Sequence, residues 1–190
     1  MKKYVALAAL MACVPGVAFA QDKTDDAKLS GVRLEARLGY ETPTISDDND
    51  IYKIGSAVSY GGEAGFDFRV KKVTIGAYAV YEGSSVSLCD GGDCLKENGN
   101  FGAGGRLGFI VAPKVVLYAK AGYARISFKA TSGGVSADAN KDGVQGALGV
   151  DVNVSKNVYL MAEMSYADYG SFYGINLQRR HVATGIGVRF

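Results

Sequence analysis

The sequence predicts an all-β fold, an eight-stranded antiparallel up-and-down transmembrane β-barrel. Three observations predict it: segments alternate apolar and polar side chains, their connections are alternately short and long, and aromatic residues gather at both ends of the apolar faces. Strict alternation is typical of a strand that has a different environment on each face. Short turns on one side and long loops on the other are typical of membrane barrels, whose strands cross the bilayer in about 9–11 residues.

Four segments in the first half of the chain show this alternation, at 31–41, 58–69, 73–82 and 100–111. Their apolar faces run, in order, from Val32 to Tyr40, from Tyr60 to Phe68, from Val73 to Tyr81, and from Phe101 to Phe109. The residues between are mostly charged, hydroxyl-bearing or glycine. Each segment is therefore expected to be a strand with one lipid-facing and one interior face.

Four segments in the second half do the same, at 115–128, 144–153, 158–169 and 181–190. The last is the clearest, because Val182, Thr184, Ile186, Val188 and Phe190 alternate with His181, Ala183, Gly185, Gly187 and Arg189. A terminal Phe190 on the apolar face fits an aromatic girdle at the membrane boundary.

The connections between these segments alternate in length. Tight turns are expected at 70–72, 112–114 and 155–157, and long polar loops at 42–57, 83–99, 129–143 and 170–179. If the first strand runs outward, the loop-end aromatics are Tyr40, Tyr60, Tyr81, Phe101, Tyr123 and Tyr166. The turn-end aromatics are Phe66, Phe68, Phe109 and Phe190. Two aromatic girdles around an aliphatic band are what a bilayer requires.

Three short motifs give the chain a resemblance to a known family. These are the Gly-Ile-Gly-Val-Arg-Phe190 ending, Ala121-Gly122-Tyr123, and Tyr166-Ala167-Asp168-Tyr169-Gly170. Over residues 30–190 the chain resembles the eight-stranded outer-membrane barrels of Gram-negative bacteria, the OmpA-barrel, OmpX and opacity-type proteins. The resemblance implies that the ending, with Phe190, is the signal by which the barrel-assembly machinery recognises its clients. The peptidoglycan-binding part of the OmpA pattern does not follow Phe190.

The N-terminal residues predict export. Lys2 and Lys3, a short apolar run and Ala18-Phe19-Ala20 indicate a signal peptide over residues 1–20, followed by a polar leader at 21–29. A lipoprotein signal that lipidates Cys13 is the alternative. No later stretch is long and apolar enough for a transmembrane helix. Loss of Lys2 and Lys3 leaves a net charge of about zero, which argues against nucleic acid as a partner.

Two cysteines remain after export, Cys89 and Cys94 in Cys-Asp-Gly-Gly-Asp-Cys. An even number of cysteines in an exported chain predicts a disulfide, which here would pin the tip of a loop. A metal site is the weaker alternative, because two sulfurs without a nearby histidine leave the coordination incomplete.

The polar faces of the strands are rich in charge. Since unpaired charges in a narrow lumen are costly, we expect ion pairs inside the barrel. The residues expected in them are Arg33, Glu35, Arg37, Glu63, Asp67, Arg69, Arg106, Lys120, Asp151, Glu163 and Arg189. An eight-stranded barrel is just wide enough for side chains to fill it, so a plugged lumen is expected, with a small gated pore as the alternative.

Two arginines, Arg125 and Arg180, fall on the lipid-facing side at the loop end. Phosphates of lipopolysaccharide are natural partners for arginine there, because its guanidinium binds phosphate in a bidentate manner. Simple extension of the two side chains into the headgroup layer is the alternative.

Metal, cofactor and catalytic sites are not expected. The stretches 138–143 and 47–50 are rich in oxygen ligands, but the first lacks the closing glutamate of a calcium loop. The single histidine, His181, has Asp168 and Ser171 near it across the last loop, but the His-x-Ser pattern of lipid A deacylase barrels is missing. The protein is not expected to be an enzyme.

Together these features predict a small integral outer-membrane protein, expected to be a monomer in contact with outer-membrane lipids and lipopolysaccharide. Its role would be structural support of the envelope or surface interaction through four extracellular loops. A narrow porin-like channel is the alternative. A soluble lipocalin-like carrier, with the apolar faces turned inward, is a third class.

Overall fold

The computed structural model describes residues 29–46, 51–53, 56–85, 87–90, 93–132, 135–172 and 175–190. The predicted signal peptide, most of the leader, Cys13 and the oxygen-rich stretch 47–50 lie outside these residues. No helix in the described part of the chain is long and apolar enough to cross a membrane.

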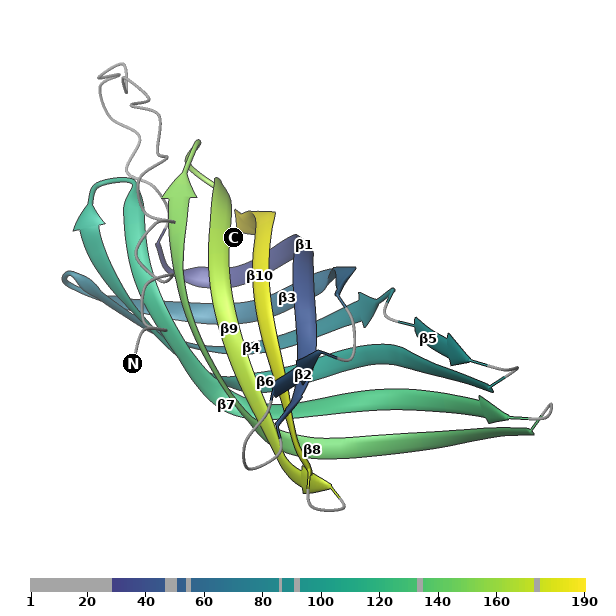
Figure 1. The fold of residues 1–190 in the computed structure, drawn as a ribbon. Coiled ribbons are helices and arrows are strands. Elements are labelled where there is room, and N and C mark those ends of the chain that lie inside the picture. The colour runs from purple at the N-terminus through teal and green to yellow at the C-terminus, as the bar shows by residue number, and fades with distance from the viewer. Residues whose placement is uncertain are drawn as a thin grey trace, which may run out of the picture.

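The predicted eight-stranded antiparallel barrel is confirmed (Figure 1). Its long strands are β1 Gly31–Ser46, β3 Ala57–Val70, β4 Val73–Ser84, β6 Asp93–Ala112, β7 Val115–Ser132, β8 Val135–Asn153, β9 Val158–Phe172 and β10 Ile175–Arg189. Two short strands, β2 Ile51–Lys53 and β5 Ser87–Asp90, pair with β1 and β6. Each long strand pairs with its neighbour in the chain, and β1 pairs with β10, which closes the sheet.

The two faces of the sheet have opposite character. Leu38 is 56% exposed and Leu148 is 61% exposed, whereas Arg33 and Asp151 are fully buried. Apolar side chains therefore cover the outside and charged ones fill the inside. This is the reverse of a soluble barrel and the arrangement that a hydrocarbon surrounding stabilises. The lipocalin-like alternative, which needs an apolar interior, is wrong.

The long connections differ from the sequence-based expectation. The stretches 83–99 and 129–143 were expected as loops, but they belong largely to β5, β6, β7 and β8, which extend well past the body of the barrel (Figure 1). Backbone hydrogen bonds between hairpin partners hold these extensions. Near the tip of the β7–β8 hairpin, where residues 136–140 are all exposed, both faces meet solvent. The apolar–polar alternation therefore disappears there and the strands leave no periodic signal.

The turn end of the barrel is compact. Val70 and Val73 pair across a two-residue turn in which Lys71 has a left-handed φ of 56°. The Phe190 backbone N–H donates to the Val32 carbonyl at 2.9 Å, so the end of the chain joins the sheet. Inside this end, Leu29 packs on Val116.

Candidate functional site

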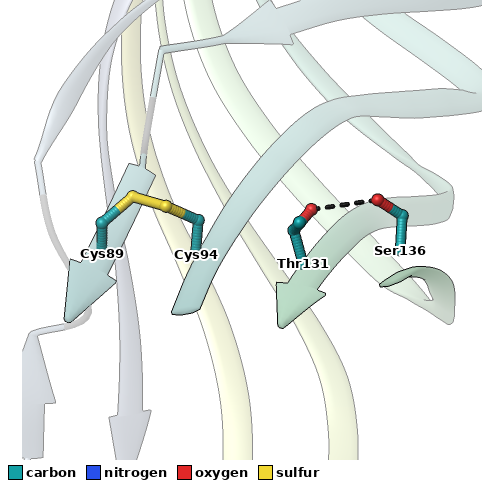
Figure 2. Close-up of a disulfide and its surroundings, with 4 residues drawn as sticks. All are labelled: Cys89, Cys94, Thr131 and Ser136. Carbon is teal, nitrogen blue, oxygen red and sulfur yellow. Dashed lines mark hydrogen bonds between the residues drawn. A yellow bond between two sulfur atoms is a disulfide. The ribbon is translucent and has the colours of Figure 1, made fainter. Parts of the chain in front are cut away.

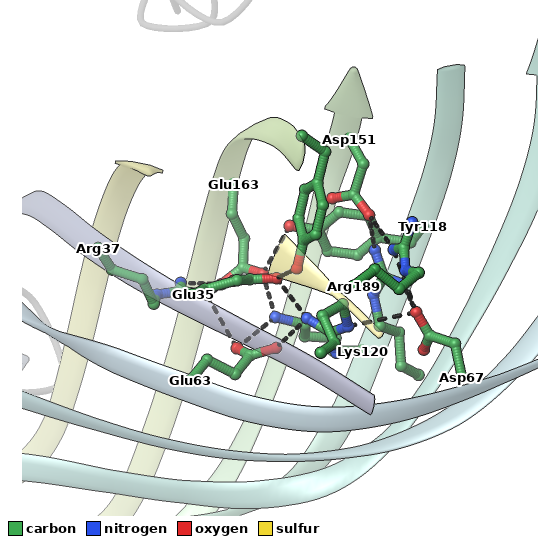
Figure 3. Close-up of polar contacts among 12 residues, drawn as sticks. Glu35, Arg37, Glu63, Asp67, Tyr118, Lys120, Asp151, Glu163 and Arg189 are labelled. Carbon is green, nitrogen blue, oxygen red and sulfur yellow. Dashed lines mark hydrogen bonds and ion pairs between the residues drawn. The ribbon is translucent and has the colours of Figure 1, made fainter. Parts of the chain in front are cut away.

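The middle of the lumen is occupied by a network of alternating charges (Figure 3). Lys120 Nζ on β7 lies 2.6 Å from carboxylate oxygens of both Glu63 and Glu163. Arg37 reaches the same two carboxylates at 2.8 and 2.5 Å. Glu35 joins the network through ion pairs with Arg33 and Arg37. The strands supply these residues at every second position, which places them on one face.

Two tyrosines complete this layer. Tyr118 donates its hydroxyl to Glu163 at 2.9 Å, and Tyr159 donates to Glu35 at 2.7 Å. Neither tyrosine was among the predicted site residues. Their place in the alternation was a usable signal, because both stand on the polar face of strands expected to bury charge.

A second charged layer lies nearer the turn end. Arg106 bonds Asp67 at 2.8 Å and Asp151 at 2.6 Å, and Arg189 approaches the same two carboxylates at 3.3 and 3.1 Å. Arg33 connects the layers, since it reaches Glu63 at 2.8 Å and Asp67 at 3.2 Å. A single chain of ion pairs thus runs through most of the lumen.

A third layer at the loop end was not predicted. Arg179 bonds Glu41 at 2.5 Å and Glu82 at 3.0 Å, and Arg37 links this layer to the middle one through Glu82 at 3.1 Å. Glu41 and Glu82 continue the polar faces of their strands, so alternation could have found them. Arg179 could not be placed, because it fell in the stretch expected to be a loop.

Arg69 does not belong to the lumen, contrary to expectation. Its side chain is exposed, and its Nε donates to the Lys71 carbonyl at 2.9 Å. Arg69 is the last polar-face residue before the turn at 71–72, so its side chain reaches past the rim of the barrel and bonds the turn.

His181 lies inside the lumen near the loop end. Its Nε2 is 2.7 Å from Ser59 Oγ, and its Nδ1 is 3.4 Å from Ser165 Oγ and 3.7 Å from Glu82. A Cβ on Gly39 would lie 2.1 Å from this ring, so any larger residue there would displace the imidazole from this position. Ser59 and His181 are buried, so these side chains pack the lumen near its loop end.

The pairing of His181 with Asp168 that the sequence suggested is not formed. Asp168 stands on the opposite face of the sheet, where its carboxylate accepts from the Gly170 backbone N–H at 2.8 Å. The side chain of Ser171 lies outside the described part of the structure.

Side chains pack closely in the middle of the lumen. The cavity between Arg37, Glu63, Lys120 and Glu163 has a volume of about 10 Å³, which is about the least that holds one water molecule. Towards the loop end, an apolar cluster of Ala124, Ile126, Ala167, Tyr169 and Leu177 packs inside the wall.

One buried carboxylate at the outer mouth has no partner among the described residues. Glu97 on β6 is 4% exposed, and neither of its carboxylate oxygens accepts a hydrogen bond there. It lies beyond Phe101, which marks the aromatic girdle, and therefore outside the bilayer. Burial, and then the negative charge of Glu41, raise the pKa of Glu97 to about 8.

Cys89 and Cys94 face each other across the β5–β6 hairpin, with an S–S distance of 2.08 Å (Figure 2). The next hairpin is joined near its tip by Thr131 and Ser136, whose hydroxyl oxygens are 3.1 Å apart. The stretch 138–143, considered as a calcium loop, is part of β8. An extended strand does not curl its oxygens around one ion.

The two lipid-facing arginines have different surroundings. Arg125 holds Asp142 through Nε at 2.6 Å and Nη2 at 3.2 Å, and Tyr123 donates to the same carboxylate at 2.5 Å. Arg180 has no ion-pair partner among the residues that the structure describes, and its side chain is exposed. Only one of the two cations is therefore left without a carboxylate.

Comparisons with known proteins agree with the geometry. A family model described as "Outer membrane protein beta-barrel domain" matches residues 5–190. Among solved structures, the chain is similar to Ail, the attachment invasion locus protein of Yersinia pestis, in complex with the heparin analogue sucrose octasulfate. The TM-score is 0.57 at 14% identity, over 83% of this chain and 99% of Ail.

Neisserial surface protein A, NspA, is similar at a TM-score of 0.56 and 18% identity, over 83% of this chain and 97% of NspA. At these identities the likeness concerns the fold alone. No curated protein matches the chain in sequence. Because the family model spans nearly all of the chain and the closed barrel agrees with it, this chain belongs to the outer membrane protein β-barrel family of Gram-negative bacteria.

Proposed function

We propose that this protein is a closed, non-conducting barrel of the outer membrane that supports the envelope and carries rigid extracellular hairpins for surface interaction. The observation that carries the proposal is the lumen. Three layers of ion pairs are linked through Arg33 and Arg37, and the cavity between them measures about 10 Å³.

The hairpins supply the surface-interaction part of the proposal. β6, β7 and β8 continue outward as paired strands, and the disulfide between Cys89 and Cys94 ties the β5–β6 tip (Figures 1 and 2). A pre-ordered surface loses less conformational entropy when a partner binds. Ail and NspA, an attachment invasion locus protein and a surface protein by name, support this role by analogy of fold.

The remaining parts of the proposal concern export, assembly into the membrane and oligomeric state. Residues 1–20 direct export and are cleaved, and Phe190 is read by the barrel-assembly machinery. The protein acts as a monomer, and the pairing of β1 with β10 supports this in one respect, because it leaves no open edge in the barrel wall with which a strand of a second copy could pair.

A narrow channel is the competing function, and planar-bilayer recording of the purified full chain decides between them. We expect no discrete conductance steps for the wild-type barrel in neutral-pH salt. Steady single-channel steps in several independent preparations would instead assign the protein to the channels. A strain lacking the protein should then be compared with its parent for detergent sensitivity, which tests the envelope role separately.

A further inference from the structure

The outer surface of β7, β8, β9, β10 and β1 carries two parallel rows of side chains with different chemistry. Strand pairing puts Thr42, Arg180, Tyr166 and Gly146 side by side in one row. The neighbouring row, one step closer to the turn end, contains Tyr40, Val182, Met164, Leu148 and Ala119. The outward row is thus polar and cationic, and the inward row is apolar.

A shallow groove follows these rows. Its volume is about 640 Å³, within the range of about 300–1,000 Å³ that is usual for small-molecule sites. The groove is hollow at Gly146 and Ala119, which have little or no side chain, and Leu148, Met164 and Val182 line it. These three side chains are about half exposed, so lipid must cover them in the membrane.

Arg180 lies at the outward side of the groove and is one of its lining residues. Among the described residues, Asp168 lies on the same face in the neighbouring strand, where it is engaged by the Gly170 backbone N–H and by Asn176. Arg180 can therefore offer its guanidinium to an external anion. Arg125 cannot do so as freely, because Asp142 already occupies it.

We infer that this groove binds one lipid A moiety of lipopolysaccharide, with an acyl chain along Leu148, Met164 and Val182 and a phosphate on Arg180. The chemistry of the rows matches the ligand, since an anionic headgroup lies outward of its acyl chains in the outer leaflet. Arginine binds phosphate through two parallel hydrogen bonds. The inference rests on the proposed function only for the placement of the loop end at the outer leaflet.

A second groove on the lipid-facing side provides an internal comparison. It lies between β1, β3, β4 and β6, has a volume of about 360 Å³, and is lined on its outer side by Leu34, Ala64, Ala79, Tyr81 and Phe101. No cation is among its described lining residues. It is therefore expected to accept any acyl chain, without preference for a phosphorylated headgroup.

Two pairs of variants separate the groove from general lipid contact. Gly146→Phe places a ring in the groove, and a Cβ at Gly146 meets its nearest atom, the Lys120 carbonyl oxygen, at 3.8 Å, so the backbone leaves room for a side chain to begin there. Gly105→Phe is its control, because Gly105 is also lipid-facing and its Cβ would lie 4.0 Å from the nearest atom. Arg180→Gln removes the free cation, and Arg125→Gln removes the paired one.

Native mass spectrometry of the full chain, delipidated in detergent, measures the binding of diphosphoryl lipid A and of phosphatidylglycerol. We expect one lipid A per barrel, preferred over phosphatidylglycerol. Loss of a charged hydrogen bond should weaken binding about tenfold or more in Arg180→Gln. A similar loss is expected in Gly146→Phe, and neither control should change binding more than about twofold.

Equal binding of the two lipids to the wild type would overturn the inference, because the groove would then hold boundary lipid. Equal losses in the controls would overturn it as well. The preference of the wild type for lipid A over phosphatidylglycerol is measured without any variant. For each variant, heat-dependent gel mobility reports whether the barrel is folded. Failure of the groove would leave the proposed closed barrel intact, since conductance and envelope integrity are measured independently.

Discussion

Lys120 on β7 and Glu63 on β3 meet across the lumen, with Nζ 2.6 Å from Oε2. Along the wall, β7 and β3 are three strand pairings apart, so the contact joins distant parts of the barrel. Glu63 also bonds Arg33 and Arg37, both at 2.8 Å. Glu63 is thus the anion that holds most of the positive charge in the middle layer.

Glu63→Gln should destabilise the barrel by about 3–5 kcal/mol, because it leaves buried cations without compensation. Urea unfolding in lipid vesicles, followed by tyrosine fluorescence, measures the change. The double variant Glu63→Gln, Lys120→Met removes one cation together with the anion and should recover part of the loss. Asp142→Asn is the control, since solvent screens the exposed Arg125–Asp142 pair and its loss should change the stability little. A loss in Glu63→Gln no larger than in this control would contradict the proposed importance of the layer.

Glu97 predicts a pH dependence at the outer mouth. Its pKa is raised from its ordinary value of 4.5 to about 8, so the folded protein holds a proton that the unfolded chain has released between these values. Stability therefore falls as the pH rises from about 4.5 to about 8 and is level above that. Glu97→Gln should remove this slope and stabilise the protein at pH 8 by about 1–3 kcal/mol, because a neutral amide replaces a buried unpaired charge.

The measurement for Glu97 is the unfolding free energy at several pH values, for wild type and variant in parallel. Lys96→Gln serves as the control, because Lys96 is the neighbouring exposed residue on the same strand and should leave the slope unchanged. An identical pH slope in wild type and Glu97→Gln would refute the assignment.

The body of the barrel could be predicted because the membrane imposes its own pattern. Leu38 and Arg37 face lipid and lumen respectively, and this contrast between neighbours repeats along each spanning strand. The extracellular extensions could not be predicted in the same way. Asp138 and Ala139 in β8 are both exposed, so neither face is apolar and only the hairpin's backbone pairing defines the strand.

The sequence predicted most residues of the interior network but not which of them form ion pairs with one another. Alternation identifies Arg37 as an interior residue, but its partners Glu63, Glu82 and Glu163 come from three other strands. Which of them it meets depends on the register and tilt of the closed barrel. The interior position expected for Arg69 was wrong because alternation does not show where β3 ends. The turn that follows sets that point.

The disulfide at the hairpin tip predicts a local effect. Replacing both Cys89 and Cys94 by serine should lower the free energy of opening of the β5–β6 tip by about 2 kcal/mol, as the chain-entropy model gives for so short a loop. Hydrogen exchange with mass spectrometry measures this, with peptides from β9 and β10 as the control region that should not change. Uniform acceleration over the whole barrel would show that the bond supports more than the tip. Mass analysis of the untreated protein should find both thiols oxidised.

The β3–β4 turn offers a stabilising change. Lys71 is held at φ 56°, a left-handed conformation that costs a residue with a Cβ about 1–2 kcal/mol. Lys71→Gly removes this cost but adds flexibility to the unfolded chain, so a net gain of about 0.5–1 kcal/mol is expected. Its matched control is Lys72→Gly in the same turn, where φ is not positive and glycine should destabilise by about the same amount. Urea unfolding of the three proteins in one vesicle preparation gives the comparison. A loss of stability in both variants would mean that Lys71 is not strained, whereas opposite signs establish that the turn, and not the loss of charge, is responsible.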